Sequence, residues 1–236
     1  MTRKVSPEAC RGVRRGERLT NCGGARRSEP GSHAFTLIEL ILVVGIITVL
    51  AGLVLSTVGY ARKKGARARA ETEIAAMSAA LENYKADNGV YPKDPTAGTA
   101  TDTVDAKTMG NPATYQTASL VLYRTLSGDR NLDLSVTVAD ENFNIDGTGL
   151  SPPLSQVPQS YFTFKPQMLE GPRDANGNLT SVTYIKDPFG NSYGYSTAYQ
   201  YNASTGYNPT FDLWSTSGLA NTPPTQLDQN QWIKNW

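Results

Sequence analysis

A near-continuous apolar run dominates the sequence, FTLIELILVVGIITVLAGLVL at residues 35–55. In these 21 residues only Thr36, Glu39 and Thr48 carry polar side-chain atoms. As an α-helix the run would be about 31 Å long at about 1.5 Å per residue, enough to cross the hydrocarbon core of a bilayer. Few soluble helices stay apolar on every side for this length. The run therefore predicts a transmembrane helix.

Besides a buried soluble helix, such a run could also be mistaken for a secretory signal peptide. Its apolar region is about 7–15 residues long and ends in a small-residue cleavage site. The run is longer here, and no A-x-A pattern precedes the basic residues of the following STVGYARKKGARARAE. We therefore do not expect cleavage after the run.

The 34 residues before the run differ from the rest in charge and composition. They contain eight Lys/Arg and three Glu, a net charge of +5, whereas the remainder has a net charge of −4. Stretches such as RGVRRGER and GGARRSEPGS contain too few apolar residues for a core. This segment is therefore predicted to be disordered.

Cysteine and histidine are confined to the same segment, as Cys10, Cys22 and His33. From Phe35 onward the chain therefore has no disulfide, thiolate nucleophile or histidine base, and almost no zinc chemistry is available to it. The composition argues against an enzyme.

Basic residues flank the run on both sides, so the positive-inside rule does not fix an orientation. Before it are Arg15, Arg18, Arg26 and Arg27, and after it are Arg62, Lys63, Lys64, Arg67 and Arg69. We interpret the second group as an anchor beside lipid headgroups. Nucleic-acid binding is disfavoured, because no aromatic residues alternate with these charges.

Glu39 is the unusual residue of the run. A carboxylate inside a membrane is costly unless it finds a partner, and the run contains no Lys, Arg or His. Cutting the chain just before Phe35 would create an α-amino group. The acid is explained if that amine, in the same or a neighbouring subunit, pairs with it.

The stretch from Ala34 to Leu55 resembles the class III signal of type IV pilins and type II secretion pseudopilins. The resemblance implies that a prepilin peptidase cuts between Ala34 and Phe35 on the cytoplasmic side and that Phe35 is then N-methylated. It also implies that Glu39, the fifth mature residue, serves in assembly. The family usually has glycine where this chain has Ala34, which implies slower cleavage.

The helix is predicted to continue beyond the membrane. In ARAETEIAAMSAALENYKADNGVYP the apolar residues recur at spacings of three and four. Gly89 suits a left-handed C-cap and Pro92 cannot continue a helix, so one helix is expected from about Phe35 to Asn88. This stripe, which we expect to pack on a domain, is formed by Ile74, Met77, Leu81 and Tyr84. The candidate sites for a helix bend or for close packing between helices are Gly45, Gly52, Gly59 and Gly65.

Residues 93 to about 160 are expected to be a loop-rich insertion with one short helix in ASLVLYRTLSGD. The stretch DENFNIDGTG invites a calcium interpretation. It fails the EF-hand pattern, because Ile145 takes the glycine position and Ser151 the bidentate glutamate position. A turn is preferred.

Strand-like runs follow in SYFTFKPQML, LTSVTYIKD, DPFGNSYGYSTA and PTFDLWSTSG, and Asn176-Gly177 is a hairpin signal. They predict a small antiparallel sheet whose apolar face covers the helix stripe. The fold class is therefore α+β, with a long N-terminal helix on a C-terminal sheet.

The C-terminal part, with DPFGNSYGY, FDLWSTSG and QWIKNW, is similar to the closing sheet and tail of major pseudopilins. In that family the loop after the DLWS-like strand holds calcium, and Asn221 and Asp228 are the candidate oxygen donors here. The acidic residues expected around position 220 are missing. The alternative is a loop held by packing of Trp214, Trp232 and Trp236.

The expected organisation is a leader at 1–34, a helix at 35–88 with its transmembrane part at 35–55, and a globular domain at 89–236. The expected function is a structural subunit of a type II secretion pseudopilus, without enzyme activity. Its expected partners are the prepilin peptidase, copies of itself, minor pseudopilins, the inner-membrane assembly platform and lipid, and no nucleic acid. The expected location is the bacterial inner membrane, single-pass, with the domain in the periplasm. A type IV pilus pilin and a stand-alone membrane-anchored binding domain remain alternatives.

Processing gives the first test. Protein recovered from membranes that contain the cognate peptidase should begin at Phe35 and carry one added methyl group, as read by intact mass and N-terminal sequencing. A chain that still carries Cys10 and Cys22 would contradict the prediction and favour the anchored binding domain.

Overall fold

A computed structural model describes residues 35–94, 100–149 and 157–236. The chain divides into two compact units, Met1–Leu50 and Ala51–Trp236. The predicted leader at 1–34 and the residue before the expected cut, Ala34, lie outside the described residues.

Helix α1 spans Leu37–Asn88 and is 52 residues long. Its end is the predicted one: Gly89 has φ +77°, and its N–H donates to the Lys85 carbonyl. A left-handed residue at this position satisfies a terminal carbonyl at little steric cost, because glycine has no Cβ. The prediction of one helix ending at Asn88 is confirmed.

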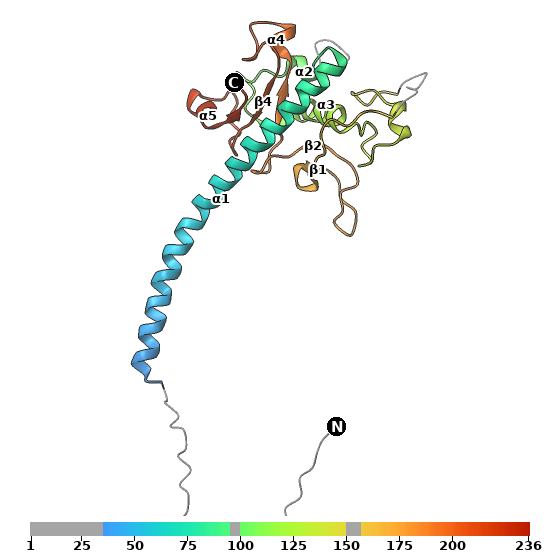
Figure 1. Cartoon of the computed structure of the whole chain (residues 1–236). Helices are drawn as coiled ribbons and strands as arrows, with labels where there is room; N and C mark the ends of the chain where they lie inside the picture. The colour runs from blue at the N-terminus through green and yellow to red at the C-terminus, as the bar shows by residue number, and fades with distance from the viewer. Residues whose placement is uncertain (1–34, 95–99, 150–156) are drawn as a thin grey trace, which may run out of the picture. The chain divides into compact units, whose positions relative to one another are not determined.

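Among the described residues of the second unit, five short strands form two antiparallel sheets (Figure 1). β1 (Leu169–Glu170) pairs with β2 (Tyr184–Ile185). The other sheet has the order β3-β4-β5, with bounds Gly194–Ser196, Asp212–Ser215 and Ile233–Lys234. Gly194 faces Trp214 so closely that a Cβ there would collide with the indole ring.

In the described part of the chain, four further α-helices and three 3-10 helices connect these elements. The α-helices are α2 (Ala100–Thr103), α3 (Gln116–Ser127), α4 (Ala198–Tyr201) and α5 (Gln226–Gln231), and the 3-10 helices are η1 (Pro112–Tyr115), η2 (Val138–Asn142) and η3 (Pro166–Met168). Helix α3 is the one predicted in ASLVLYRTLSGD, and it ends at Gly128 with φ +83°.

The main core forms where the C-terminal part of α1 packs on the strands. Ile74, Met77 and Leu81 of the predicted stripe are almost fully buried. The same cluster contains residues of α3 and of both sheets, among them Leu122, Ile185, Tyr195 and Leu213, and also Tyr193, which directly precedes β3. The predicted α+β packing of the helix on antiparallel strands is confirmed.

A polar contact sits inside this apolar interface. The Tyr193 hydroxyl donates to Glu73 Oε2 at 2.7 Å, and Arg69 Nε lies 2.6 Å from Glu73 Oε1. Burial is the main cause that raises the pKa of Tyr193, and the neighbouring Glu73 carboxylate adds to it. Tyr193 favours one docking position of α1, because a shifted helix would keep the Arg69 pair but lose the buried hydrogen bond between Tyr193 and Glu73.

A second cluster joins the predicted insertion to the C-terminus. Trp214 and Trp232 stack with ring centroids 6.2 Å apart, and Trp214 meets Tyr115 edge-on at 5.2 Å. Val104, Ala106 and Ala118 complete the cluster. Part of the segment expected to be loop-rich therefore contributes buried side chains to the domain.

Two details of the strand prediction were wrong. There are two small sheets instead of one, and SYFTF is not a strand. The N–H groups of Tyr161 and Phe162 both donate to the Leu126 carbonyl at the end of α3. The predicted hairpin is present: Gly177 has φ +85°, and its N–H donates to the Asp174 carbonyl.

The core stripe yields a stability prediction. Leu81→Ala should lower the free energy of unfolding by about 2–5 kcal/mol, because it opens a cavity where the side chain is fully buried. Denaturant unfolding of the full chain in detergent, followed by tryptophan fluorescence, measures the loss.

The matched control is Leu227→Ala, because Leu227 is 74% exposed. Equal losses in the two variants would contradict the placement of Leu81 in the core.

Candidate functional site

The start of α1 holds the residue that the sequence singles out. Glu39 Oε2 accepts hydrogen bonds from the Thr36 N–H at 2.9 Å and from the Thr36 hydroxyl at 2.8 Å. In return the Glu39 N–H donates to Thr36 Oγ1 at 3.3 Å. This reciprocal pattern is a capping box, which satisfies N–H groups that a helix start leaves without partners.

The sequence prediction names only a cationic partner for Glu39, and the structure adds Thr36 as a neutral one. The signal was in the sequence, since Thr36-Leu-Ile-Glu39 has the spacing of a capping box. A carboxylate near a helix N-terminus also interacts favourably with the helix dipole. Glu39 Oε1 accepts none of these bonds, so the cap and a pairing with an α-amino group are compatible.

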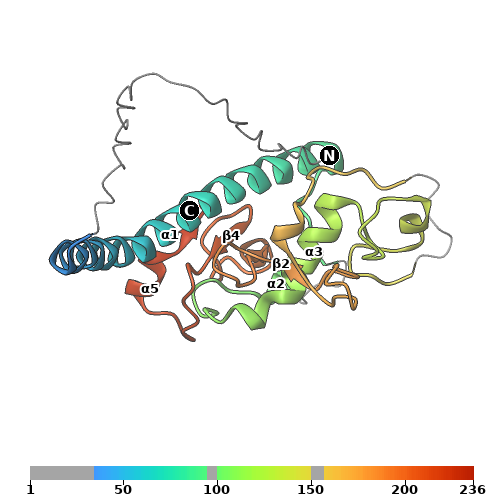
Figure 2. The ribbon, with the colours of Figure 1, turned by 90° about the horizontal axis from the view of Figure 1, so that it is seen from below.

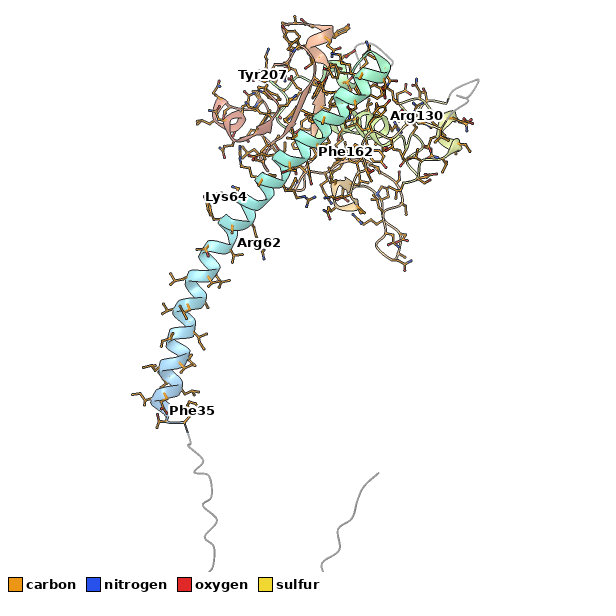
Figure 3. The ribbon with its side chains drawn as sticks, viewed as in Figure 1. Phe35, Arg62, Lys64, Arg130, Phe162 and Tyr207 are labelled. Carbon is orange, nitrogen blue, oxygen red and sulfur yellow. The ribbon has the colours of Figure 1, made fainter. Side chains whose placement is uncertain are left out.

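The apolar run is exposed along its whole length. Every residue from Phe35 to Leu55 is solvent-exposed, and Phe35 reaches 82% (Figure 3). By length and composition, α1 can cross a membrane. A Cβ added at Gly45, Gly52, Gly59 or Gly65 would meet no atom within 4 Å, so a packing role for these glycines between subunits stays a prediction.

The basic residues after the run divide into two kinds. Arg67 and Arg69 form ion pairs one turn along, with Glu71 at 3.2 Å and Glu73 at 2.6 Å. Arg67 Nη1 also donates to the Gln231 carbonyl at 2.7 Å. Arg62, Lys63 and Lys64 are exposed. The predicted lipid anchor therefore includes one side chain, Arg67, that also fixes the C-terminal segment to α1.

The structure brings the two calcium candidates together. Asn221 Nδ2 donates to Asp228 Oδ2 at 3.0 Å. The same oxygen accepts from the Thr225 N–H and hydroxyl, which makes Asp228 part of the capping box of α5. Hydrogen bonds from Thr225, followed by that from Asn221, hold the pKa of Asp228 below its ordinary value.

Calcium prefers six to eight oxygen ligands, several of them carboxylate. Within the described residues, no group of three or more His, Cys, Asp or Glu can hold a metal ion. The three tryptophans of the alternative interpretation do pack together, since Trp214 lies 6.2 Å from Trp232 and 6.0 Å from Trp236. Calcium binding through Asn221 and Asp228 stays a prediction.

The earlier acidic stretch forms a turn, as preferred. Asp140 Oδ2 accepts from the Thr137 N–H in the capping box of η2, and its Oδ1 accepts from the N–H groups of Arg130 and Asn131. Asp146 Oδ1 accepts from the Thr148 N–H in the next turn. These carboxylates therefore hold the local backbone.

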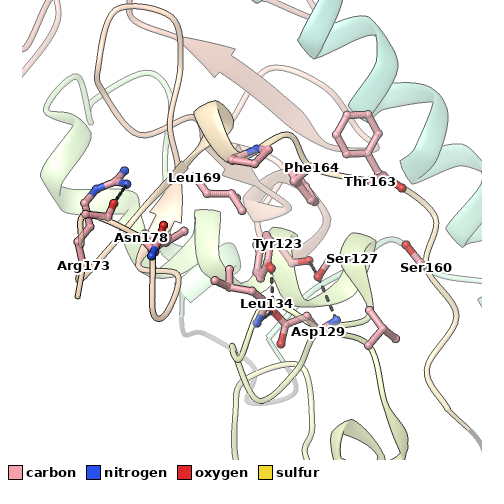
Figure 4. Close-up of a pocket in the computed structure, with 15 residues that line it drawn as sticks. Tyr123, Ser127, Asp129, Leu134, Ser160, Thr163, Phe164, Leu169, Arg173 and Asn178 are labelled. Carbon is pink, nitrogen blue, oxygen red and sulfur yellow. Dashed lines mark hydrogen bonds between the residues drawn. The ribbon is translucent and has the colours of Figure 1, made fainter. Parts of the chain in front are cut away.

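A surface hollow of about 520 Å³ was not foreseen (Figure 4). Tyr123 of α3 donates to Asp129 Oδ2 at 2.7 Å at its base. Burial is the main cause that raises the pKa of Asp129, and hydrogen bonds from Tyr123 and the Leu134 N–H oppose it. Phe164 and Leu169 line the same hollow. Its residues come from segments far apart in the chain, so periodicity gave no sign of it.

Calcium binding can be tested by measuring the midpoint of thermal unfolding in the presence of calcium and in the presence of a chelator. A midpoint that rises with calcium in the wild type, but not in Asp228→Asn, is the outcome expected if the predicted site exists. Midpoints equal under both conditions would mean that the capping box and the tryptophan packing hold the loop.

Curated relatives match the N-terminal part of the chain. "Type II secretion system core protein G" of Pseudomonas aeruginosa is 42% identical over 67 residues, which are 28% of this chain and 45% of the relative. The Vibrio cholerae protein of the same name is 41% identical over 58 residues, 25% of this chain and 40% of the relative. The Pectobacterium carotovorum protein of the same name is 36% identical over 73 residues, which are 30% of this chain and 47% of the relative.

The chain spans somewhat less than half the length of these relatives. No family model and no solved structure matches it. The relatives share a name that assigns them to a secretion system. The resemblance of the chain to the major pseudopilin family of type II secretion is therefore confirmed in its N-terminal part.

Proposed function

We propose that the chain is a structural subunit of a type II secretion pseudopilus and not an enzyme. The observation that carries the proposal is the exposed apolar helix that opens with a capped Glu39, in the part of the chain that resembles secretion core proteins. A helix whose apolar side chains are exposed along its length needs lipid or other copies around it.

Processing comes first in the proposed sequence of events. The prepilin peptidase cuts between Ala34 and Phe35, and Phe35 is N-methylated. The mature chain then waits in the inner membrane as a single-pass protein, with its globular domain in the periplasm. Thr36 satisfies the Glu39 carboxylate during this stage, because both partners belong to the same helix start.

Assembly moves α1 from lipid into a filament of copies of the chain and minor pseudopilins, on an inner-membrane platform. In an apolar bundle, a carboxylate favours the stagger in which it meets a cation. The α-amino group of Phe35 in a neighbouring copy is that cation. Glu39 therefore sets the register of the subunits, and the filament helps to move proteins across the outer membrane.

The Glu39→Ala variant tests this role. We expect normal cleavage and methylation but no filaments, because the variant keeps the apolar helix and loses the group that sets the stagger. Intact mass measures processing, and electron microscopy with quantification of the sheared fraction measures assembly.

Thr48→Ala is the matched control. It removes another polar group from the same run, one whose hydroxyl donates only to the Val44 carbonyl within the helix. Filaments of Glu39→Ala at the wild-type level would refute the assembly role.

A secretion assay in a deletion strain separates the pseudopilus from a type IV pilus. Loss of the chain should leave exported proteins in the periplasm, with surface pili and motility unchanged. Loss of pili or motility with normal secretion would favour the pilin alternative.

A further inference from the structure

One face of α1 carries three cations just after the apolar run. Tyr60, Lys63, Lys64 and Arg67 are spaced i, i+3, i+4 and i+7, so they share one side of the helix. The same side continues into Ala70 and the buried stripe. The cationic face is therefore directly in line with the face on which the domain packs.

The C-terminal part of the chain supplies the opposite wall. Phe189 precedes β3, Ser217 and Leu219 follow β4, and Gln231 ends α5. With the four residues of α1 they line a hollow of about 360 Å³. Figure 2 shows α5 near α1. The two are joined by Arg67 of α1, whose Nη1 donates to the Gln231 carbonyl at 2.7 Å.

The charges in this hollow are of one sign. Arg67 already pairs with Glu71 and with the Gln231 carbonyl, so it acts mainly as a fixed part of the wall. Neither Lys63 nor Lys64 has a carboxylate within 4 Å in the part of the chain that the structure describes. Two ammonium groups without a counter-ion, beside a fixed guanidinium, favour an anionic occupant.

The position along α1 indicates where that anion comes from. Tyr60 lies about 7.5 Å and Lys64 about 13.5 Å beyond Leu55 along the axis, at about 1.5 Å per residue. The headgroup layer is roughly 5–7 Å thick on each side of the hydrocarbon core. Helical side chains lean toward the N-terminus, and lysine can extend its ammonium toward the interface. Both lysines can therefore reach headgroup phosphates, while Tyr60 lies at the interface itself.

We propose that this hollow binds the headgroup of one anionic phospholipid. Lys63 and Lys64 bind the phosphodiester oxygens, and Phe189 and Leu219 form the apolar part of the opposite wall. The site would hold the domain against the membrane surface before assembly. This inference rests on the membrane insertion in the proposed function.

Lipid selectivity tests the site. The full chain is reconstituted in vesicles of phosphatidylcholine with a minor share of phosphatidylglycerol and extracted in mild detergent, and native mass spectrometry counts the lipids that stay bound. We expect phosphatidylglycerol to be enriched on the wild type. Lys64→Gln should reduce that enrichment about five-fold, the effect of one basic residue near a charged surface.

Arg62→Gln is the matched control (Figure 3). It makes the same change of charge two residues away, about 200° around the helix, and Arg62 does not line the hollow. Arg62 belongs to the same basic group and contributes to the diffuse attraction, so a clearly smaller loss in this variant than in Lys64→Gln supports a defined site. Equal losses in both variants would overturn it in favour of diffuse attraction.

Two further outcomes would also overturn the site. One is enrichment of neither lipid on the wild type. The other is displacement of the lipid by millimolar inorganic phosphate, which would mean that a free phosphate is the ligand. Failure of the chain to float with the vesicles would refute membrane insertion and hence the proposed function as well, so the two failures are distinguishable.

Discussion

The globular unit depends on the burial of one side of α1 beneath the strands. Ile74, Met77 and Leu81 take part in a core that also contains residues of α3 and of both sheets. The strands are two to four residues long, too short to form stable sheets by themselves. The helix therefore supplies the apolar surface on which the short strands and their connections assemble.

Two glutamates of α1 have different roles, one at the start of the helix and one in its C-terminal half. Glu39 is bound by the backbone and hydroxyl of Thr36, three residues away. Glu73 is bound by Tyr193, which is 120 positions further along the chain. The first contact stabilises the helix start wherever the helix lies, and the second favours one position of the domain on the helix.

These features fit a subunit that changes its surroundings during its life. The apolar side chains at 35–55 are exposed and suited to lipid or to other copies of the chain, whereas the C-terminal part of α1 contributes to the core of its own domain. The cationic face with Lys63 and Lys64 lies between them. In the proposed sequence of events it binds the membrane surface while the subunit waits there.

By itself the sequence determined the features that depend on local order. The apolar run, the stripe of Ile74, Met77 and Leu81, the glycine end of α1 and the short helix α3 follow from spacing and from single residue types, because a helix is specified by neighbours within a turn or two. The capping box of Thr36 and Glu39 also joins residues close in the chain, but the sequence prediction did not include it. The tertiary structure alone decided the partners that are distant in the chain. One is the hydrogen bond from Tyr193 to Glu73, and another is the pair of bonds from the Tyr161 and Phe162 N–H groups to the end of α3, where a strand was predicted. The others are the packing of Tyr115 on Trp214 and the hollow in which Phe189 and Leu219 lie opposite Lys64. Such contacts arise only when the chain closes on itself, so no periodicity records them.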